Sequence, residues 1–107
     1  MTEILNLGQE INLTGKSGTS YHGRILDKSG TTISTSRAIV CLANSYYSNG
    51  QWQHKIKDIY NADNESEAVE EFKKRDDVTH LILIPRTINE RERFDKIQDL
   101  IQQYIHQ

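Results

Sequence analysis

The stretch that most constrains the fold of this 107-residue chain runs from Val78 to Ile84. Residues 81–84 are Leu-Ile-Leu-Ile, so a strand built from them is apolar on both faces. Pro85 follows and has no N–H with which to continue the strand. A strand with two apolar faces cannot stand at a solvated edge. We therefore predict that this strand lies at the centre of a sheet.

Turn signals divide the first 60 residues into further strands. Two short strands, Glu10 to Leu13 and Ser20 to Leu26, flank a turn-rich segment at residues 14–19 and form an N-terminal hairpin. A second hairpin joins Ala38–Leu42 to Trp52–Tyr60 around Asn49-Gly50, since both turn residues tolerate positive φ. Strict alternation along the return strand predicts one face made by the following residues: Trp52, His54, Ile56, Asp58 and Tyr60.

Two helices are predicted from capping signals and apolar spacing. Asn64, with Glu67 three residues later, opens a helix over Glu65–Arg75 whose buried stripe is Ala68, Val69 and Phe72. A second capping box at Thr87–Glu90 opens a longer helix. Its apolar stripe consists of Phe94, Ile97, Leu100, Ile101, Tyr104 and Ile105.

These elements predict one α+β domain over residues 1–107, with a small, largely antiparallel sheet, an N-terminal hairpin and two flanking helices. Cys41 is the only cysteine, which excludes an intramolecular disulfide and a cysteine-rich zinc site. The chain has neither a charged-then-apolar leader nor an apolar run near the length of a membrane span. We therefore expect a cytoplasmic protein that does not enter a membrane.

Charge is distributed unequally between the two halves of the chain. The net charge is −2, but residues 1–60 carry six Lys and Arg against four Asp and Glu, whereas residues 61–107 carry seven against eleven. Any surface that faces phosphate would therefore belong to the first half. Its basic residues are Lys16, Arg24, Lys28, Arg37, Lys55 and Lys57. Four of these, Lys16, Arg24, Lys55 and Lys57, are our candidates for nucleic-acid contact.

The sequence Gly15-Lys16-Ser17 matches the end of a nucleotide-binding P-loop motif, but the rest of that motif is missing. That motif needs a glycine five residues before Gly15, where this chain has Glu10. It also needs a helix after the lysine, because helix amides bind the phosphates, whereas Ser20 to Leu26 alternates like a strand. Nucleotide binding by this segment is therefore not expected.

The order of hairpin, central strand, tyrosine-bearing strand, helix, strand and helix resembles the GIY-YIG endonuclease superfamily. The resemblance extends from about Leu13 to Tyr104. Ala38-Ile39-Val40 occupies the place of the first motif and Ile59-Tyr60-Asn61-Ala62 that of the second, so Val40 replaces a tyrosine while Tyr60 is retained. The family's helical arginine falls on Glu70 or Glu71. Its metal-binding glutamate falls on Gln98, within Ile97-Gln98-Asp99-Leu100-Ile101.

What the resemblance implies is a GIY-YIG-like fold that has lost its chemistry. The family's tyrosine handles a proton, its arginine offsets charge in the transition state, and its glutamate holds a divalent cation. Val40, Glu71 and Gln98 can do none of these. We accordingly expect no metal site and no cofactor. A relocated site that pairs His54 with His22 and Tyr60 is the remaining catalytic hypothesis.

The leading functional expectation is a non-enzymatic binding or accessory module. Its partner would be an unidentified protein or weakly and non-specifically bound nucleic acid. The first alternative is a divergent DNA endonuclease that depends on Mg²⁺ or Mn²⁺. The second is an inhibitor or immunity-type protein that binds a basic partner through an acidic helix face, made by Glu65, Glu67, Glu70 and Glu71. The sequence leaves the oligomeric state open.

Overall fold

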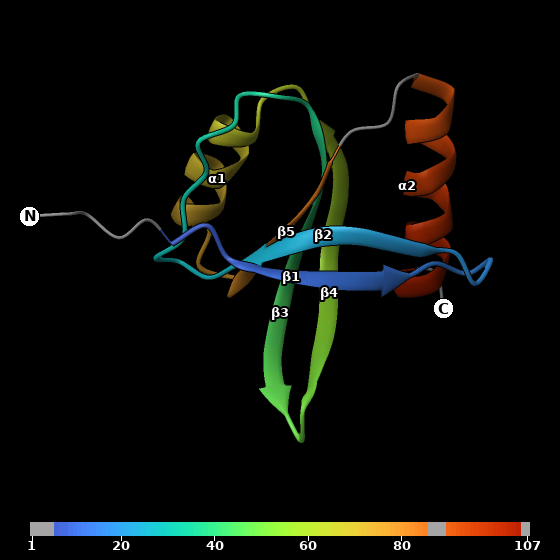
Figure 1. Ribbon diagram of the computed structural model, residues 1–107, viewed down its shortest axis with the longest axis horizontal. Helices are drawn as coiled ribbons and strands as arrows, with labels where there is room; N and C mark the ends of the chain where they lie inside the picture. The colour runs from blue at the N-terminus through green and yellow to red at the C-terminus, as the bar shows by residue number, and fades with distance from the viewer. Residues whose placement is uncertain (1–5, 86–89, 106–107) are drawn as a thin grey trace, which may run out of the picture.

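The computed structural model describes residues 6–85 and 90–105, which form five strands and two helices (Figure 1). The strands are β1 (Gln9–Thr14), β2 (Ser20–Leu26), β3 (Ala38–Ser48), β4 (Gln51–Ala62) and β5 (His80–Pro85). The helices are α1 (Glu65–Lys74), between β4 and β5, and α2 (Glu90–Tyr104), after β5. All strands pair antiparallel in the order β1-β2-β5-β3-β4. The prediction of an α+β fold with an antiparallel sheet and two helices is confirmed.

The apolar strand β5 is the middle strand of the sheet, as the sequence predicts. On one side it pairs with β2, from Arg24↔Leu83 to Leu26↔Leu81. On the other side it pairs with β3, from Ala38↔Pro85 to Ala43↔His80. The side chains of residues 81–84 are all buried. Both faces of the sheet therefore need a cover along this strand.

Each helix covers a different face of the sheet, so the molecule has two apolar cores. Leu81 and Leu83 point to the core beneath α1, where Phe72 is the largest fully buried side chain. Ile82 and Ile84 point to the core beneath α2, which includes the fully buried Leu100. Figure 1 shows the curled sheet, with β1 and β2 crossing β3 and β4 between the two helices.

Only part of the apolar stripe of α2 packs against the sheet. Leu100 is buried, and Ile97, Ile101 and Tyr104 pack partly against the same core. Phe94, which the spacing assigns to the stripe, is 62% exposed. It lies in the first half of α2, before the turns that pack on the sheet, so the prediction of its burial is wrong. The rest of the predicted capping box, residues 87–89, lies outside the described residues.

A β-bulge at Lys57 changes which residues of β4 share a face. Leu42 pairs with Asp58 and Ala43 pairs with Ile56, so Lys57 is an extra residue on β4. Before the bulge, Ile56 faces the core beneath α2; after it, Ile59 faces the same core, and Tyr60 packs on the α1 side. The predicted single face from Trp52 to Tyr60 is therefore wrong, because one inserted residue inverts the alternation.

The glycine-rich turn between β1 and β2 binds a carboxylate from the last helix. Asp99 Oδ1 accepts a hydrogen bond from the Ser17 N–H at 2.8 Å, and Oδ2 accepts from Ser17 Oγ at 2.7 Å and from Tyr21 Oη at 2.6 Å. A side chain at Gly15 would collide with Asp99, since an added Cβ would lie 2.1 Å from Oδ2. The turn thus holds an anion of the chain itself, which agrees with the rejection of a P-loop.

These hydrogen bonds also shift the pKa values of the two partners. They lower the pKa of Asp99, because Tyr21 and Ser17 stabilise the ionised carboxylate. Burial, followed by the bond to Asp99, raises the pKa of Tyr21 to about 12. Asp99 therefore joins α2 to the first hairpin most firmly when it is ionised.

We expect Asp99→Ala to lower the free energy of unfolding by about 2 kcal/mol, the usual scale for hydrogen bonds to a charged group. Asp95→Ala, at an exposed position of the same helix, controls for the higher helix propensity of alanine. A carboxyl with a lowered pKa stabilises the fold above its unfolded-state pKa, and this contribution disappears as pH falls through the folded-state value. Urea unfolding at pH 7 and pH 3 should show the difference at pH 7 and a much smaller one at pH 3. Equal stability of the two variants at pH 7 would contradict this role.

Candidate functional site

The β3–β4 hairpin extends beyond the rest of the sheet. Pairing between β3 and β5 ends at Ala43↔His80, whereas β3 and β4 remain paired as far as Ser48↔Gln51. We call residues 44–57 the β3–β4 arm: residues 44–55 extend beyond β5, and Ile56, which pairs with Ala43, and the bulged Lys57 form its base. The end of the arm is the lowest point of the molecule in Figure 1. Asn49 and Gly50 have φ of 53° and 76°, which are the positive values that a two-residue type I′ turn requires. The predicted turn is confirmed.

The arm presents aromatic rings on both of its faces. Tyr47 pairs with Trp52 and Tyr46 pairs with Gln53, so the two tyrosines point to opposite sides. Their exposed fractions are 63% for Tyr46 and 62% for Tyr47. Tyr47 contacts Trp52 edge-on, with ring centroids 5.4 Å apart. The exposed aromatic surface of the arm is thus supported by a ring that is itself partly buried.

Trp52 pairs with Tyr47 near the end of the arm, and its ring contacts two histidines. Its ring is stacked with that of His54 at 6.0 Å and meets His80 of β5 edge-on at 5.4 Å. Ser45 Oγ lies 2.7 Å from His54 Nδ1, and Thr79 Oγ1 lies 2.9 Å from His80 Nδ1. Each imidazole is therefore fixed by a hydroxyl group as well as by the indole.

Burial lowers the pKa of both histidines. His54 is affected first by desolvation and then by the neighbouring charge of His80. The pKa of His80 is lowered by desolvation, and Asp27 acts in the opposite direction. Both rings are therefore neutral at pH 7, and the cluster holds no positive charge at that pH.

The charge of the arm comes from lysine alone. Residues 44–57 include Lys55 and Lys57 and contain no Asp or Glu. Both lysines are exposed, and neither forms an ion pair with any residue that the structure describes. Asp58 directly follows Lys57 in the chain, and Asp77, which Lys57 also influences, has its carboxylate held by Arg75 with a shortest distance of 2.6 Å. The arm is thus a cationic and aromatic projection on a chain with a net charge of −2.

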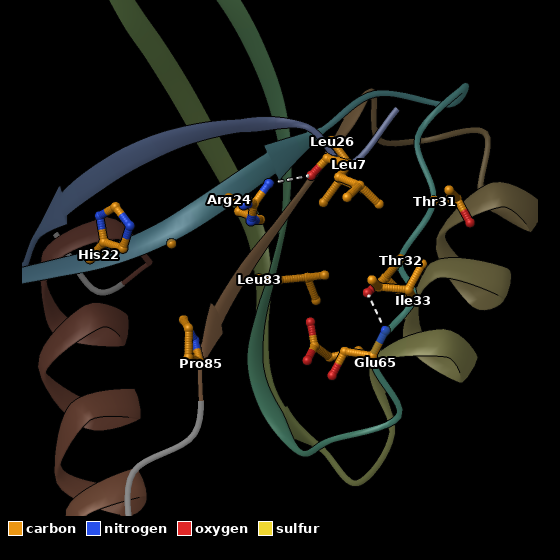
Figure 2. Close-up of a pocket in the computed structure, with 12 residues that line it drawn as sticks. Leu7, His22, Arg24, Leu26, Thr31, Thr32, Ile33, Glu65, Leu83 and Pro85 are labelled. Atoms are coloured by element: carbon orange, nitrogen blue, oxygen red, sulfur yellow. Dashed lines mark hydrogen bonds between the residues drawn. The ribbon is translucent and has the colours of Figure 1, made fainter. Parts of the chain in front are cut away.

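A second candidate is a groove of about 300 Å³ beside α1 (Figure 2). Its floor is apolar and includes Leu7, Leu26 and Leu83. Arg24 of β2 donates to the Leu7 carbonyl at 3.2 Å on one side, and Glu65 of α1 lies on the other. Because one cation and one anion line the same groove, its charges favour neither an anionic nor a cationic ligand.

Three of the four positions suggested by the family resemblance lie together on the α1 side of the sheet. Val40 pairs directly with Tyr60, and Val40 is fully buried. Tyr60 and Glu71 line one hollow of about 220 Å³, together with Asp63 and Glu67. Burial, Asp58 and Glu71 raise the pKa of Tyr60, so its hydroxyl is held in the protonated form. This environment does not favour a tyrosine that gives up its proton.

Gln98 does not join these three positions. It lies on α2, which covers the opposite face of the sheet, and it lines a hollow that also includes Ser17, Tyr21 and Gln102. The family resemblance implies one site that includes both Gln98 and Tyr60, and the structure does not bring these two residues together. The two helices separate because the central strand needs an apolar cover on both faces.

The proposed relocated site is likewise not assembled. His54 lies on the α2 side of β4, whereas Tyr60 lies on the α1 side beyond the bulge. His22 is exposed on β2, where its Nε2 lies 3.8 Å from Glu10 Oε1, and it lines the groove of Figure 2. His54 is instead part of the aromatic cluster around Trp52.

The basic residues of the first half are spread over several surfaces. Lys16 is in the β1–β2 turn, Arg24 lines the groove of Figure 2, and Arg37 lies 3.8 Å from the Asp63 carboxylate. Lys28 donates hydrogen bonds to the carbonyls of Phe72 and Arg75, and its ammonium is 4.3 Å from the centre of the Phe72 ring. Lys28 thus caps the C-terminal end of α1. Of the candidates for nucleic-acid contact, only Lys55 and Lys57 lie together.

We expect Lys28→Met to lower the free energy of unfolding by about 1–3 kcal/mol, because α1 loses a charged partner for its last carbonyl groups. The methionine keeps an apolar chain over Phe72, so the loss isolates the hydrogen bonds. Thermal unfolding of this variant should be compared with Lys16→Met, which removes an exposed lysine. A Lys28→Met protein as stable as Lys16→Met would exclude the capping role.

We expect the stability of the protein to decrease as pH falls below about 6.5, in part through His54 and His80. A histidine with a lowered pKa binds fewer protons in the folded chain than in the unfolded chain, so acid favours unfolding. The decrease between pH 7.5 and pH 5.5 should be smaller in His54→Gln/His80→Gln than in the original chain. His22→Gln, which removes an exposed histidine, should show the same decrease in stability as the original chain. An unchanged pH profile in the double variant would contradict this assignment.

No protein family model, no curated protein and no solved structure matches this chain. Within residues 6–85 and 90–105, no helix is long and apolar enough to cross a membrane, and no three His, Cys, Asp or Glu side chains are grouped as metal ligands would be. Lys55, Lys57 and His54 are identified as candidates from the sequence alone, but the aromatic surface beside them is not. The signal for that surface is present in the sequence, as two tyrosines and a tryptophan around Asn49-Gly50.

Proposed function

We propose that this protein is a non-enzymatic binding module that contacts nucleic acid weakly through the β3–β4 arm. The observation that carries this proposal is the arm itself, which projects beyond the pairing with β5 and bears exposed Tyr46, Tyr47 and Lys55, with exposed Lys57 at its base and no carboxylate within residues 44–57. Lysine side chains that approach phosphates release condensed counterions, which supplies affinity without regard to base sequence. Aromatic rings beside them add surface that bases can contact.

The environment of the family-derived positions supports a module without catalysis. Val40 is part of the core, the pKa of Tyr60 is raised, and Glu71 adds negative charge where a phosphate would have to lie. A degenerate GIY-YIG-like fold remains our proposal for the ancestry of the chain. It is supported by the order of β3, β4, α1 and β5 and by the opposition of Val40 and Tyr60. The position of Gln98 on the other side of the sheet argues against it.

We expect the affinity to be low, because only two lysines belong to the arm and the whole chain carries a net charge of −2. Non-specific complexes have dissociation constants of roughly 10⁻⁴ to 10⁻⁶ M at physiological salt, and this protein should lie near the weak end. Two phosphate contacts on a single strand predict a slope of about −1.4 in a plot of log K against log salt.

The test is a salt titration of binding to labelled DNA, both single-stranded and duplex, followed by fluorescence anisotropy. Lys55→Gln/Lys57→Gln should weaken binding and bring the salt slope close to zero, because it removes the phosphate contacts. Lys73→Gln/Lys74→Gln is the matched control, since it removes two exposed lysines from the last turn of α1. This control should bind DNA as the original chain does.

Two results would contradict the proposal. If both double variants bind equally, or if the original chain binds neither form of DNA at roughly 50 mM salt, the arm is not a nucleic-acid contact. If the purified protein cleaves DNA with Mg²⁺ or Mn²⁺, and Tyr60→Phe abolishes the cleavage, the endonuclease alternative is correct. Capture of a basic protein that Glu67→Gln/Glu70→Gln/Glu71→Gln fails to capture would favour the inhibitor alternative.

A further inference from the structure

The two exposed tyrosines of the arm differ in what surrounds them. Tyr46 shares its face of the hairpin with Lys55, because Tyr46 pairs with Gln53 and the next pair on that face is Asn44↔Lys55. Tyr47 is on the other face, where Trp52 supports it edge-on at 5.4 Å. Trp52 is in turn fixed against His54 and His80. Each tyrosine therefore extends from a β-ladder, and one of them has a cation beside it.

From this arrangement we infer that the arm selects single-stranded nucleic acid, with bases stacked on Tyr46 and Tyr47 and a backbone phosphate at Lys55. The inference rests on the proposed function and specifies which form of nucleic acid the arm binds. Base–aromatic stacking tolerates any sequence, because every base has a π face. The preference is therefore for unpaired bases and not for a particular sequence.

Charge complementarity identifies the ligand as a polyanion. The arm carries two lysines and no carboxylate; of the carboxylates beside it, Asp58 follows Lys57 in the chain and Asp77 is paired with Arg75. The exposed rings then distinguish between polyanions, because a duplex hides the faces of its bases within the stack and offers the arm only phosphates. A single strand offers both phosphates and free base faces. The two tyrosines should thus contribute to binding of single strands and contribute little to binding of duplex.

Trp52 allows direct observation of this contact. It is the only tryptophan of the chain, and it touches Tyr47. Its emission therefore reports from the arm alone, without any label on the protein. Stacking at Tyr47 should change this emission, whereas a phosphate bound elsewhere on the molecule should not.

The experiment compares an oligonucleotide of about 12 thymidines with a duplex of the same length, using anisotropy of the labelled DNA and the emission of Trp52 in the full chain. At low salt we expect the single strand to bind at least about five-fold more tightly than the duplex. Tyr46→Ala/Tyr47→Ala should weaken single-strand binding by roughly five-fold or more and leave duplex binding unchanged, which is the effect of losing stacking on the bases. Tyr46→Phe/Tyr47→Phe keeps the rings and should bind as the original chain does.

Phe94→Ala is the matched control, because Phe94 is an aromatic residue on α2 with the same 62% exposure as Tyr47. It should not change binding to either form of DNA. Circular dichroism should first establish that each variant is folded. If the alanine variant does not fold, Tyr46→Ser alone provides the same comparison, since Tyr46 has no ring partner among the described residues.

The outcomes separate the inference from the proposed function. If the chain binds DNA through Lys55 and Lys57 but binds duplex as tightly as single strands, the inference is wrong and the proposed function stands. The same conclusion follows if the alanine variant binds single strands as the phenylalanine variant does. If neither form of DNA binds, both the inference and the proposed function are wrong.

Discussion

The rest of the molecule depends on the requirement that β5 be covered on both faces. Its side chains alternate between two apolar cores, with Leu81 and Leu83 on one side and Ile82 and Ile84 on the other. Each core needs its own helix, so α1 and α2 are on opposite sides of the sheet. This division determines which residues can act together. Glu71 of α1 and Gln98 of α2 are kept apart by the sheet, while Val40, Tyr60 and Glu71 share one side.

The length of β5 determines where the β3–β4 arm begins to extend beyond the sheet. Strand β5 ends its pairing with β3 at Ala43, and the two long strands of the hairpin continue without it. An isolated hairpin is only marginally stable in water, but in this one the ring of Trp52 is stacked on His54 and also contacts His80 of β5. Trp52 pairs with Tyr47, so the same cluster supports Tyr47 near the end of the arm. Stability and a potential contact surface therefore depend on the same cluster.

Features that depend on neighbours in the sequence could be predicted from the sequence. The apolar run of β5, the type I′ turn at Asn49-Gly50 and the cap formed by Asn64 on α1 all follow from local rules, and the structure confirms them. Features that join distant residues could not be predicted in this way. Asp99 binds Ser17 across 82 residues, and Lys28 caps a helix that ends more than 40 residues later. Neither pair has a signature in sequence spacing.

The candidate site was only partly predictable, for the same reason. Lys55 and Lys57 were identified by charge alone, but the alternation rule placed His54 and Tyr60 on one face. A single inserted residue, Lys57, separates them. The proximity of Trp52 to His80 depends on how β4 and β5 approach across β3, which no local pattern indicates. Charge and aromatic content were visible in the sequence, whereas the grouping of these residues required the tertiary structure.

The bulge at Lys57 also affects how the protein behaves at high concentration. Strand β4 is at the edge of the sheet and is 12 residues long, so its outer N–H and C=O groups offer a template for another strand. The extra residue, Lys57, interrupts the regular hydrogen-bonding repeat, and its charge together with that of Lys55 repels the same edge of a second molecule. A variant of β4 without the bulge and without its two lysines would have a regular, uncharged edge that is prone to aggregation. The bulge that reorients Tyr60 thus also protects the sheet from growing by addition of further copies.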